Sequence, residues 1–133
     1  MSKYPVFGLA LLLLIACSAN RGAQNELPST PTVAAICQNL ESYRDQAVTL
    51  DGVFLGWRGG ECRMAARAGA AITRSDWLFK NGDDCIYVTG GRPQGFDPSD
   101  ARQKGRRLQL RAIVRLTKEQ KAYLEFVSGK SFQ

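Results

Sequence analysis

Residues 47–57, AVTLDGVFLGW, decide the fold. They are rich in β-branched and aromatic residues, which favour a β-strand. Gly52 and Gly56 interrupt the run, and a glycine inside a strand usually marks a bulge or a sharp bend. The stretch therefore predicts a long, bent strand, of the kind with which a small barrel turns a corner. Its apolar face is formed by Val48, Leu50 and Phe54.

A β-hairpin is predicted further along the chain. Residues 76–79 (DWLF) and 85–89 (CIYVT) are short apolar runs, and residues 80–84 between them read KNGDD. An Asn-Gly-Asp turn between two such runs is a strong local signal of a hairpin. Residues 58–75 are rich in Gly, Ala and Arg and are expected to form a long loop, with a short helical turn near residues 63–68.

The last two predicted strands are residues 106–116 and 122–127, separated by a turn. Apolar and polar side chains alternate along residues 106–116, which indicates one buried face. In the connection before this strand, residues 97–100 (DPSD) are typical of a helix cap followed by Pro, so one helical turn ending at Gly105 is expected. The buried face is formed by Leu108, Leu110, Ala112, Val114 and Leu116, and the outward face by Arg107, Gln109, Arg111, Ile113 and Arg115.

A short helix is expected at residues 32–43, with Thr32 as its cap. Val33, Ile36, Cys37 and Leu40 lie at helical spacing and form one apolar stripe. The order of elements is therefore helix, long bent strand, hairpin, short helix, strand and strand. Five strands at this spacing predict a mainly β domain, a small barrel, over residues 32–133.

Three stretches resemble an oligonucleotide/oligosaccharide-binding (OB) barrel, and in particular the periplasmic bacterial OB-fold proteins. They are VTLDGVF at 48–54, DWLFKNGDDCIYV at 76–88 and LQLRAIV at 108–114. The resemblance covers about residues 33–128. It implies a five-stranded barrel with an N-terminal helix and a short helix between strands three and four.

The N-terminus has the marks of a secretion signal. Residues 1–5 carry one Lys, and residues 6–16, VFGLALLLLIA, carry no charge. A basic start followed by about 7–15 apolar residues is typical of a signal peptide. The run is shorter than the ~20 residues that a membrane-spanning helix needs. Residues 14–17, LIAC, are similar to the lipobox of bacterial lipoproteins.

The lipobox resemblance implies that residues 1–16 are removed and that the thiol of Cys17 receives a lipid. Two or three acyl chains on one residue give stable membrane anchoring. Ser18 stands where an Asp usually retains such proteins in the inner membrane, which implies the outer membrane, facing the periplasm. Residues 17–31 are polar and are interpreted as a flexible tether. The alternatives are a soluble secreted protein with an incidental cysteine, and an uncleaved N-terminal anchor.

The composition narrows the possible chemistry. The chain has 133 residues and a net charge of +6, without any histidine. Histidine is the commonest general base and the commonest metal ligand. Asp83 and Asp84 sit in the predicted tight turn, where turn chemistry explains them. We therefore predict a non-enzymatic protein with no cofactor and no metal site.

Three cysteines remain for the domain when Cys17 is lipidated. Cys62 lies in the loop before the hairpin, and Cys85 opens the second hairpin strand. In an oxidising compartment, a Cys62–Cys85 disulfide is predicted, which would pin the long loop to the barrel. A bridge that uses Cys37, or no bridge, is the alternative. Cys37 lies on the apolar stripe of the helix and is interpreted as a small buried hydrophobe.

Arg107, Arg111 and Arg115 point outward from one predicted strand. They are the candidate anion-binding residues, for a phosphate, a lipid headgroup or a polyanionic glycan. The alternative is a solvated strand face that discourages edge pairing.

Aromatic side chains are a weaker candidate site. OB barrels often stack single-stranded nucleic acid on such residues, but core packing is expected for most of them here, and an exported protein rarely meets nucleic acid. Residues 73–77 (TRSDW) are either a binding loop or, as we favour, a turn in which Asp76 or Ser75 caps backbone amides. The aromatic candidates are Trp57, Trp77, Phe79 and Tyr87.

These features together predict a membrane-anchored envelope lipoprotein whose barrel binds a partner protein or a small anionic or glycan ligand. A structural or assembly accessory of an envelope complex is one alternative. A periplasmic enzyme inhibitor or stress protein is the other.

Overall fold

The computed structural model describes residues 30–57 and 62–132. The signal peptide, Cys17 and all but the last two residues of the predicted tether lie outside these residues. The elements in chain order are α2 (Val33–Gln38), α3 (Leu40–Tyr43), β1 (Ala47–Gly56), β2 (Arg63–Met64), β3 (Trp77–Asn81), β4 (Asp84–Thr89), the 3-10 helix η2 (Ala101–Gln103), β5 (Arg106–Leu116) and β6 (Ala122–Ser131).

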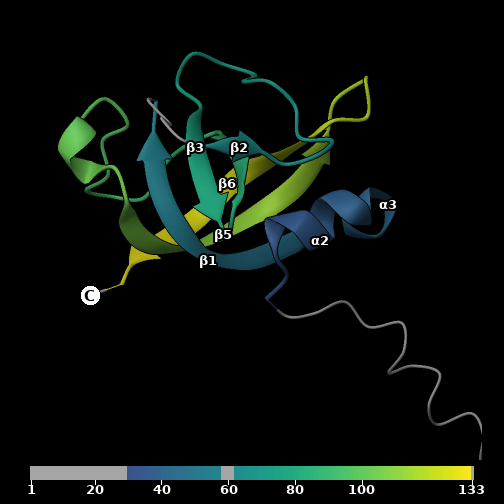
Figure 1. Cartoon of the computed structure of the whole chain (residues 1–133), viewed down its shortest axis with the longest axis horizontal. Helices are drawn as coiled ribbons and strands as arrows, with labels where there is room; N and C mark the ends of the chain where they lie inside the picture. Colours follow the sequence, from purple (N-terminus) through teal and green to yellow (C-terminus); the bar gives the residue numbers. More distant parts are fainter. Residues whose placement is uncertain (1–29, 58–61, 133) are drawn as a thin grey trace, which may run out of the picture.

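Five strands close into a barrel in the order β1-β3-β4-β6-β5 (Figure 1). β1 pairs antiparallel with both β3 and β5. The barrel is closed by a short parallel pairing of β4 with β6, in which Val88 lies opposite Leu124. The extra strand β2 runs parallel to the start of β4. The predicted mainly β, OB-like barrel is thus confirmed.

The bend of β1 allows this one strand to serve two neighbours. Its residues 47–54 pair with β5, and residues 53–56 pair with β3. Gly52 lies so close to β3 that a Cβ atom there would meet the carbonyl oxygen of Lys80 and lie 2.6 Å from Cζ of Phe79. Gly56 has a φ of +70° and follows a register shift in the pairing with β3. The two glycines are therefore required by the bend, as predicted.

The core lies inside the barrel and is closed at both ends. Phe54 packs at its centre, with ring centroids 4.9 Å from Trp77 and 5.0 Å from Phe96. Phe96 belongs to the loop before η2, which lies at the opposite end of the barrel from the two helices (Figure 1). The alternation predicted for residues 106–116 is confirmed, because Leu108, Leu110, Ala112 and Val114 are fully buried. The helices contribute Val33, Ile36, Cys37, Leu40 and Tyr43 to the core.

The prediction of a single helix at residues 32–43 is wrong in one respect. The helix breaks at Asn39, whose φ is −135°, so that α2 and α3 are separate. The side-chain Nδ2 of Asn39 donates to the carbonyl of Ala35 at 3.1 Å, and such local hydrogen bonds compete with helix continuation. The predicted cap is confirmed, because Oγ1 of Thr32 accepts from the amide of Ala35 at 3.0 Å.

Two further local predictions are corrected. Residues 63–64 form the short strand β2, and residues 65–68 form a turn that is not helical, because Arg67 has a φ of 71°. In this turn the amide of Ala68 donates to the carbonyl of Ala65 at 3.0 Å. The helical turn before β5 is capped by Asp100, which accepts from the amide of Arg102 at 2.9 Å. Asp97, the expected cap, instead accepts from the amide of Ser99 in a tight turn. The last strand continues to Ser131 and not only to residue 127.

Candidate ligand-binding face

The outer face of β1, β5 and β6 carries a shallow hollow of about 390 Å³, which we call the β5 groove. The pairing of the three strands forms this hollow. On β5, Arg111 lies between Thr49 of β1 and Ser128 of β6, and Gln109 lies between Asp51 of β1 and Lys130 of β6. Alternation along β5 sends these side chains outward while their neighbours enter the core. The groove is lined by Thr49, Gln109, Arg111, Ser128, Gly129 and Lys130.

Lys130 was not predicted as a site residue, because the last strand was expected to end at residue 127 and continues to Ser131. The pairing of β5 with β6 shifts register between Arg111 and Ala112, and Val127 has no partner residue there. This bulge places Ser128 opposite Arg111 and Lys130 opposite Gln109. The continued alternation after residue 127, in which Ser128 and Lys130 flank Gly129, was the available signal.

The three predicted arginines have different surroundings. Arg115 lies 2.8 Å from Oδ1 of Asp45 and 3.3 Å from Oε2 of Glu125. Its hydrogen bonds to Asp45 and, to a smaller extent, Glu125 raise the pKa of its guanidinium. The two carboxylates therefore offset the positive charge of Arg115. The guanidinium of Arg107 lies 5.3 Å from the ring centroid of Phe132, a cation–π contact. Arg111 lies in the groove itself.

The groove is positively charged. Across residues 30–57 and 62–132, no carboxylate lies within 4.0 Å of the cations of Arg107, Arg111 or Lys130. One acidic residue, Asp51, lies opposite the groove residue Gln109 on the neighbouring strand. Its Oδ1 accepts a hydrogen bond from Nε2 of Gln109 at 3.2 Å. A guanidinium, an ammonium and hydroxyl groups on one surface can donate several hydrogen bonds to phosphate or carboxylate oxygens.

The predicted disulfide is confirmed. Cys62 and Cys85 are bonded, with their Cα atoms 6.0 Å apart. Cys85 lies in a small apolar cluster on the outer side of β1, β3 and β4, together with Leu55 and Leu78. Leu55 and Leu78 are each only 8% exposed although they point away from the core. The bond therefore holds the loop before β3 against this outer face.

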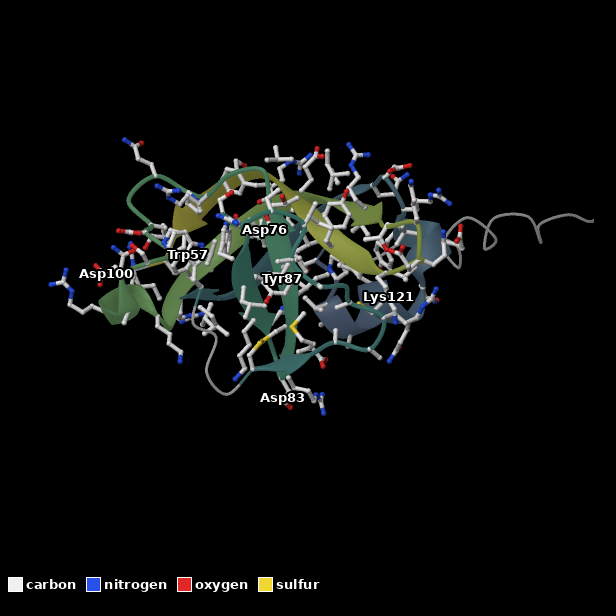
Figure 2. All side chains as sticks on the ribbon, turned by 90° about the horizontal axis from the view of Figure 1, so that it is seen from above. Trp57, Asp76, Asp83, Tyr87, Asp100 and Lys121 are labelled. Atoms are coloured by element: carbon white, nitrogen blue, oxygen red, sulfur yellow. A yellow bond between two sulfur atoms is a disulfide. The ribbon has the colours of Figure 1, made fainter. Side chains whose placement is uncertain are left out.

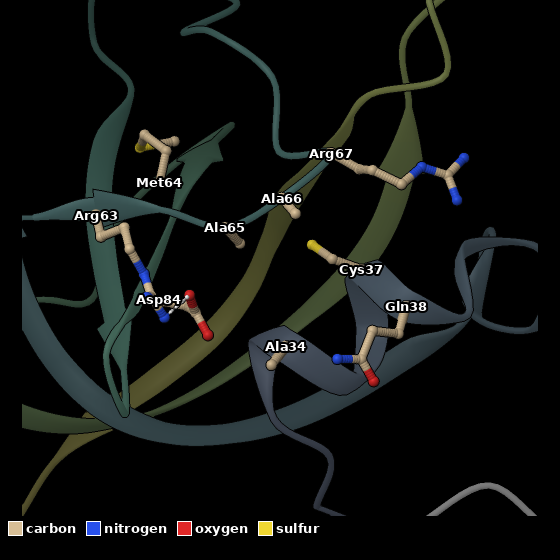
Figure 3. A pocket seen from close by; sticks show the side chains of 9 residues that line it. All are labelled: Ala34, Cys37, Gln38, Arg63, Met64, Ala65, Ala66, Arg67 and Asp84. Carbon is tan, nitrogen blue, oxygen red and sulfur yellow. Dashed lines mark hydrogen bonds and ion pairs between the residues drawn. The ribbon is translucent and has the colours of Figure 1, made fainter.

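Cys37 is free and buried, as the sequence indicated. Its pKa is raised to about 11, mainly by burial and also by the charge of Asp84, while Arg67 opposes the shift. The thiol borders a second hollow of about 680 Å³ between α2 and β2 (Figure 3). There the Nη2 atom of Arg63 is paired with Oδ1 of Asp84 at 3.0 Å, and Arg67 points away from that pair. The walls are completed by Ala34, Gln38, Met64, Ala65 and Ala66.

The aromatic candidates are mostly core residues. Trp77 and Phe79 are fully buried, and Tyr87 packs on the outer apolar cluster. Trp57 is 51% exposed and lies between Asp100 and Tyr87 in the view of Figure 2. Its Nε1 donates to the carbonyl of Ser75 at 3.5 Å. The described residues thus do not gather these rings into one stacking surface.

Residues 73–77 form the turn that the sequence favoured. Asp76 is 4% exposed, and its Oδ2 accepts from the amides of Ile72 and Thr73. Burial opposes ionisation of Asp76, but hydrogen bonds from Thr73, Thr89 and the Ile72 amide outweigh it and lower its pKa. The carboxylate of Asp76 therefore organises the start of β3.

No group of three or more metal-ligating side chains occurs among the residues that the structure describes. Asp84 is paired with Arg63, and Asp83 is exposed at the tip of the hairpin. Within the same residues, none of the helices is long and apolar enough to cross a membrane.

Comparison of the chain with models of known protein families finds no match. A comparison with curated proteins likewise finds none of significant similarity. Conclusions about function therefore depend on the surfaces of this barrel and on the N-terminal sequence.

Proposed function

We propose that the chain is a lipid-anchored, non-enzymatic protein of the bacterial envelope whose β5 groove binds an anionic ligand. Suitable ligands are a phosphate group, the carboxylates of a glycan or an acidic segment of a partner protein. The observation that carries this proposal is the position of Arg111 and Lys130 on adjoining strands of one hollow, without carboxylate partners among the described residues.

The contrast with Arg115 supports the groove as the binding surface. Arg115 is on the same strand, but two carboxylates already offset its charge. An incoming anion would compete with Asp45 and Glu125 there, whereas at Arg111 it would displace only water. Charged donors bind anions more strongly than neutral ones. The groove is thus the stronger anion site of the two.

The lipid anchor is supported by the sequence of residues 1–31. An uncharged apolar run ends in LIAC, and a polar segment joins Cys17 to Pro31, which is buried against the domain. Mass spectrometry of the chain from bacterial membranes should show Cys17 as the first residue, carrying acyl groups. An intact Met1 or an unmodified Cys17 would contradict the anchor.

Retention on a heparin column, a polyanionic glycan matrix, tests the groove. The chain should elute at higher salt than the Arg111→Ala and Lys130→Ala variants. Arg74→Ala is a matched control, because it removes the same charge from an exposed arginine outside the groove that has no carboxylate within 4.0 Å among the described residues. Equal elution of all four proteins would show that net charge, and not the groove, determines binding.

A further inference from the structure

We infer that the β5 groove faces the membrane that holds the anchor, and that Arg107, Arg111 and Lys130 bind the phosphates of its anionic phospholipids. This inference rests on the proposed lipidation of Cys17 and names the ligand of the proposed groove. The domain would therefore lie against the bilayer on one defined face instead of turning freely on its tether.

A short series of contacts joins the entry of the tether to the groove. The amide of Val33 donates to Oδ1 of Asn81 at 2.9 Å, and Nδ2 of Asn81 donates to the carbonyl of Asp51 at 2.8 Å. Asp51 lies opposite Gln109, which lines the groove, and Gln109 lies opposite Lys130. Neighbouring strands are ~4.8 Å apart, so Lys130 lies roughly 10 Å from the backbone of Asp51. Figure 1 shows the chain entering beside the bend of β1.

The tether is short enough to keep this face close to the bilayer. Thr32, the cap of α2, comes 15 residues after Cys17. A flexible chain of that length has an end-to-end distance of roughly 20 Å. The anchor therefore keeps the groove and the lipid headgroups at a high effective concentration. Even weak contacts between them are then formed for much of the time.

The pattern of charge on the groove suits a surface of phosphates. Arg107 and Arg111 are four residues apart on β5, roughly 13 Å along the strand. Lys130 extends from the neighbouring strand between them, since it pairs with Gln109. Three cations thus form a triangle on an exposed sheet. A row of separate phosphate groups can neutralise such a triangle, whereas one small anion would contact only part of it.

Protection of Lys130 in anchored protein tests this orientation. The purified full chain is inserted through its lipid into vesicles of phosphatidylcholine alone, or of phosphatidylcholine with about one third phosphatidylglycerol. A membrane-impermeant amine reagent then labels the lysines, and mass spectrometry gives the rate at each. Lys118, exposed in the turn between β5 and β6, is the internal reference. We expect phosphatidylglycerol to slow labelling of Lys130 at least five-fold relative to Lys118, and high salt to abolish the effect.

Variants separate the groove from net charge. Arg107→Ala and Arg111→Ala should each restore labelling of Lys130 by up to about five-fold, because each basic residue near an anionic surface contributes a similar factor. Arg74→Ala, which removes an exposed arginine outside the groove, should leave the protection unchanged. Equal labelling of Lys130 in both vesicles would overturn the inference.

The failures of the two proposals are distinguishable. Heparin retention that depends on Arg111, together with equal labelling in both vesicles, would leave an anion-binding groove that does not face the bilayer. Mass spectrometry that finds no acyl group on Cys17 would remove the anchor, and the orientation with it.

Discussion

Breaking the Cys62–Cys85 disulfide should cost the domain about 3 kcal/mol of unfolding free energy. The two cysteines are separated by 23 positions, and the bond closes that length of chain. In the chain-entropy treatment, removing a loop closure of this size costs about 3 kcal/mol. Because single domains are stable by only about 5–15 kcal/mol, this loss is a large part of the total. It corresponds to a fall in Tm of more than about 10 °C for a domain of this size.

Chemical denaturation of two proteins, each with and without reductant, isolates this effect. Reduction of the wild-type chain should lower the urea midpoint and raise the slope of the transition, because the unfolded chain expands when the cross-link is removed. Cys62→Ala also breaks the bond but keeps the sulfur of Cys85, which is fully buried, in place. The variant should therefore resemble the reduced wild type, and reductant should not change it further.

Two results would refute this reasoning. Reduction that leaves the urea midpoint of the wild-type chain unchanged would show that the bond does not constrain the unfolded state. A Cys62→Ala variant that responds to reductant would show that Cys37 forms a bond of its own, which conflicts with its buried thiol.

Three further predictions concern the core and the turn before β3. Gly52→Ala should lower the unfolding free energy by ~1–3 kcal/mol, measured in urea, because the new methyl group meets the backbone carbonyl of Lys80 and the ring of Phe79. Asp76→Asn should cost ~1–3 kcal/mol at pH 7, since one oxygen of the side chain becomes an NH2 group, and the carboxylate uses one oxygen for two backbone amides and the other for Oγ1 of Thr73. The pKa of Asp76 is lowered in the folded state, so its contribution is present above about pH 4 and is lost as the pH falls; equal urea midpoints of variant and wild type at pH 7 would contradict this. The thiol of Cys37, with a pKa of about 11, should react with Ellman's reagent at pH 8 only after unfolding, and rapid reaction of the native chain would contradict its burial.

The barrel was predictable because its strands carry their burial pattern locally. Each second residue of β5 from Leu108 to Val114 is fully buried, and a period of two is visible in any single strand. Gly52 and Gly56 were recognisable for the same reason, since a glycine within a strand of β-branched residues requires a steric cause. The positions of the strands and of the bend in β1 can therefore be predicted from the local sequence.

The parts that could not be predicted depend on contacts between distant residues. The balanced charge of Arg115 requires Asp45, which lies 70 positions earlier in the chain. The position of Lys130 beside Gln109 depends on a bulge in the pairing of β5 with β6. The strand β2 depends on pairing with the start of β4, where Arg63 lies opposite Asp84, 21 positions later in the chain. Register and pairing, unlike periodicity, are not visible in a single segment.

The disulfide also bears on where a ligand can bind. OB barrels commonly bind oligonucleotides or oligosaccharides on the outer face of strands two and three, which correspond here to β3 and β4. In this chain, Leu55 and Leu78 on that side are 8% exposed and pack with Cys85. Because the Cys62–Cys85 bond holds the loop before β3 there, that face is largely apolar and covered.

Arg107, Arg111 and Lys130 instead lie together on the outer face of β5 and β6. Substitutions that lower the stability of this domain should therefore differ from those that weaken binding of the anionic ligand. Cys62→Ala should lower the urea midpoint while Arg111-dependent retention on heparin persists at low temperature, where the domain is still folded. Arg111→Ala should weaken retention and leave the urea midpoint within the range of an ordinary surface substitution, about 0.5 kcal/mol. Loss of heparin retention in the folded Cys62→Ala variant would instead place the binding surface on the loop that the disulfide holds.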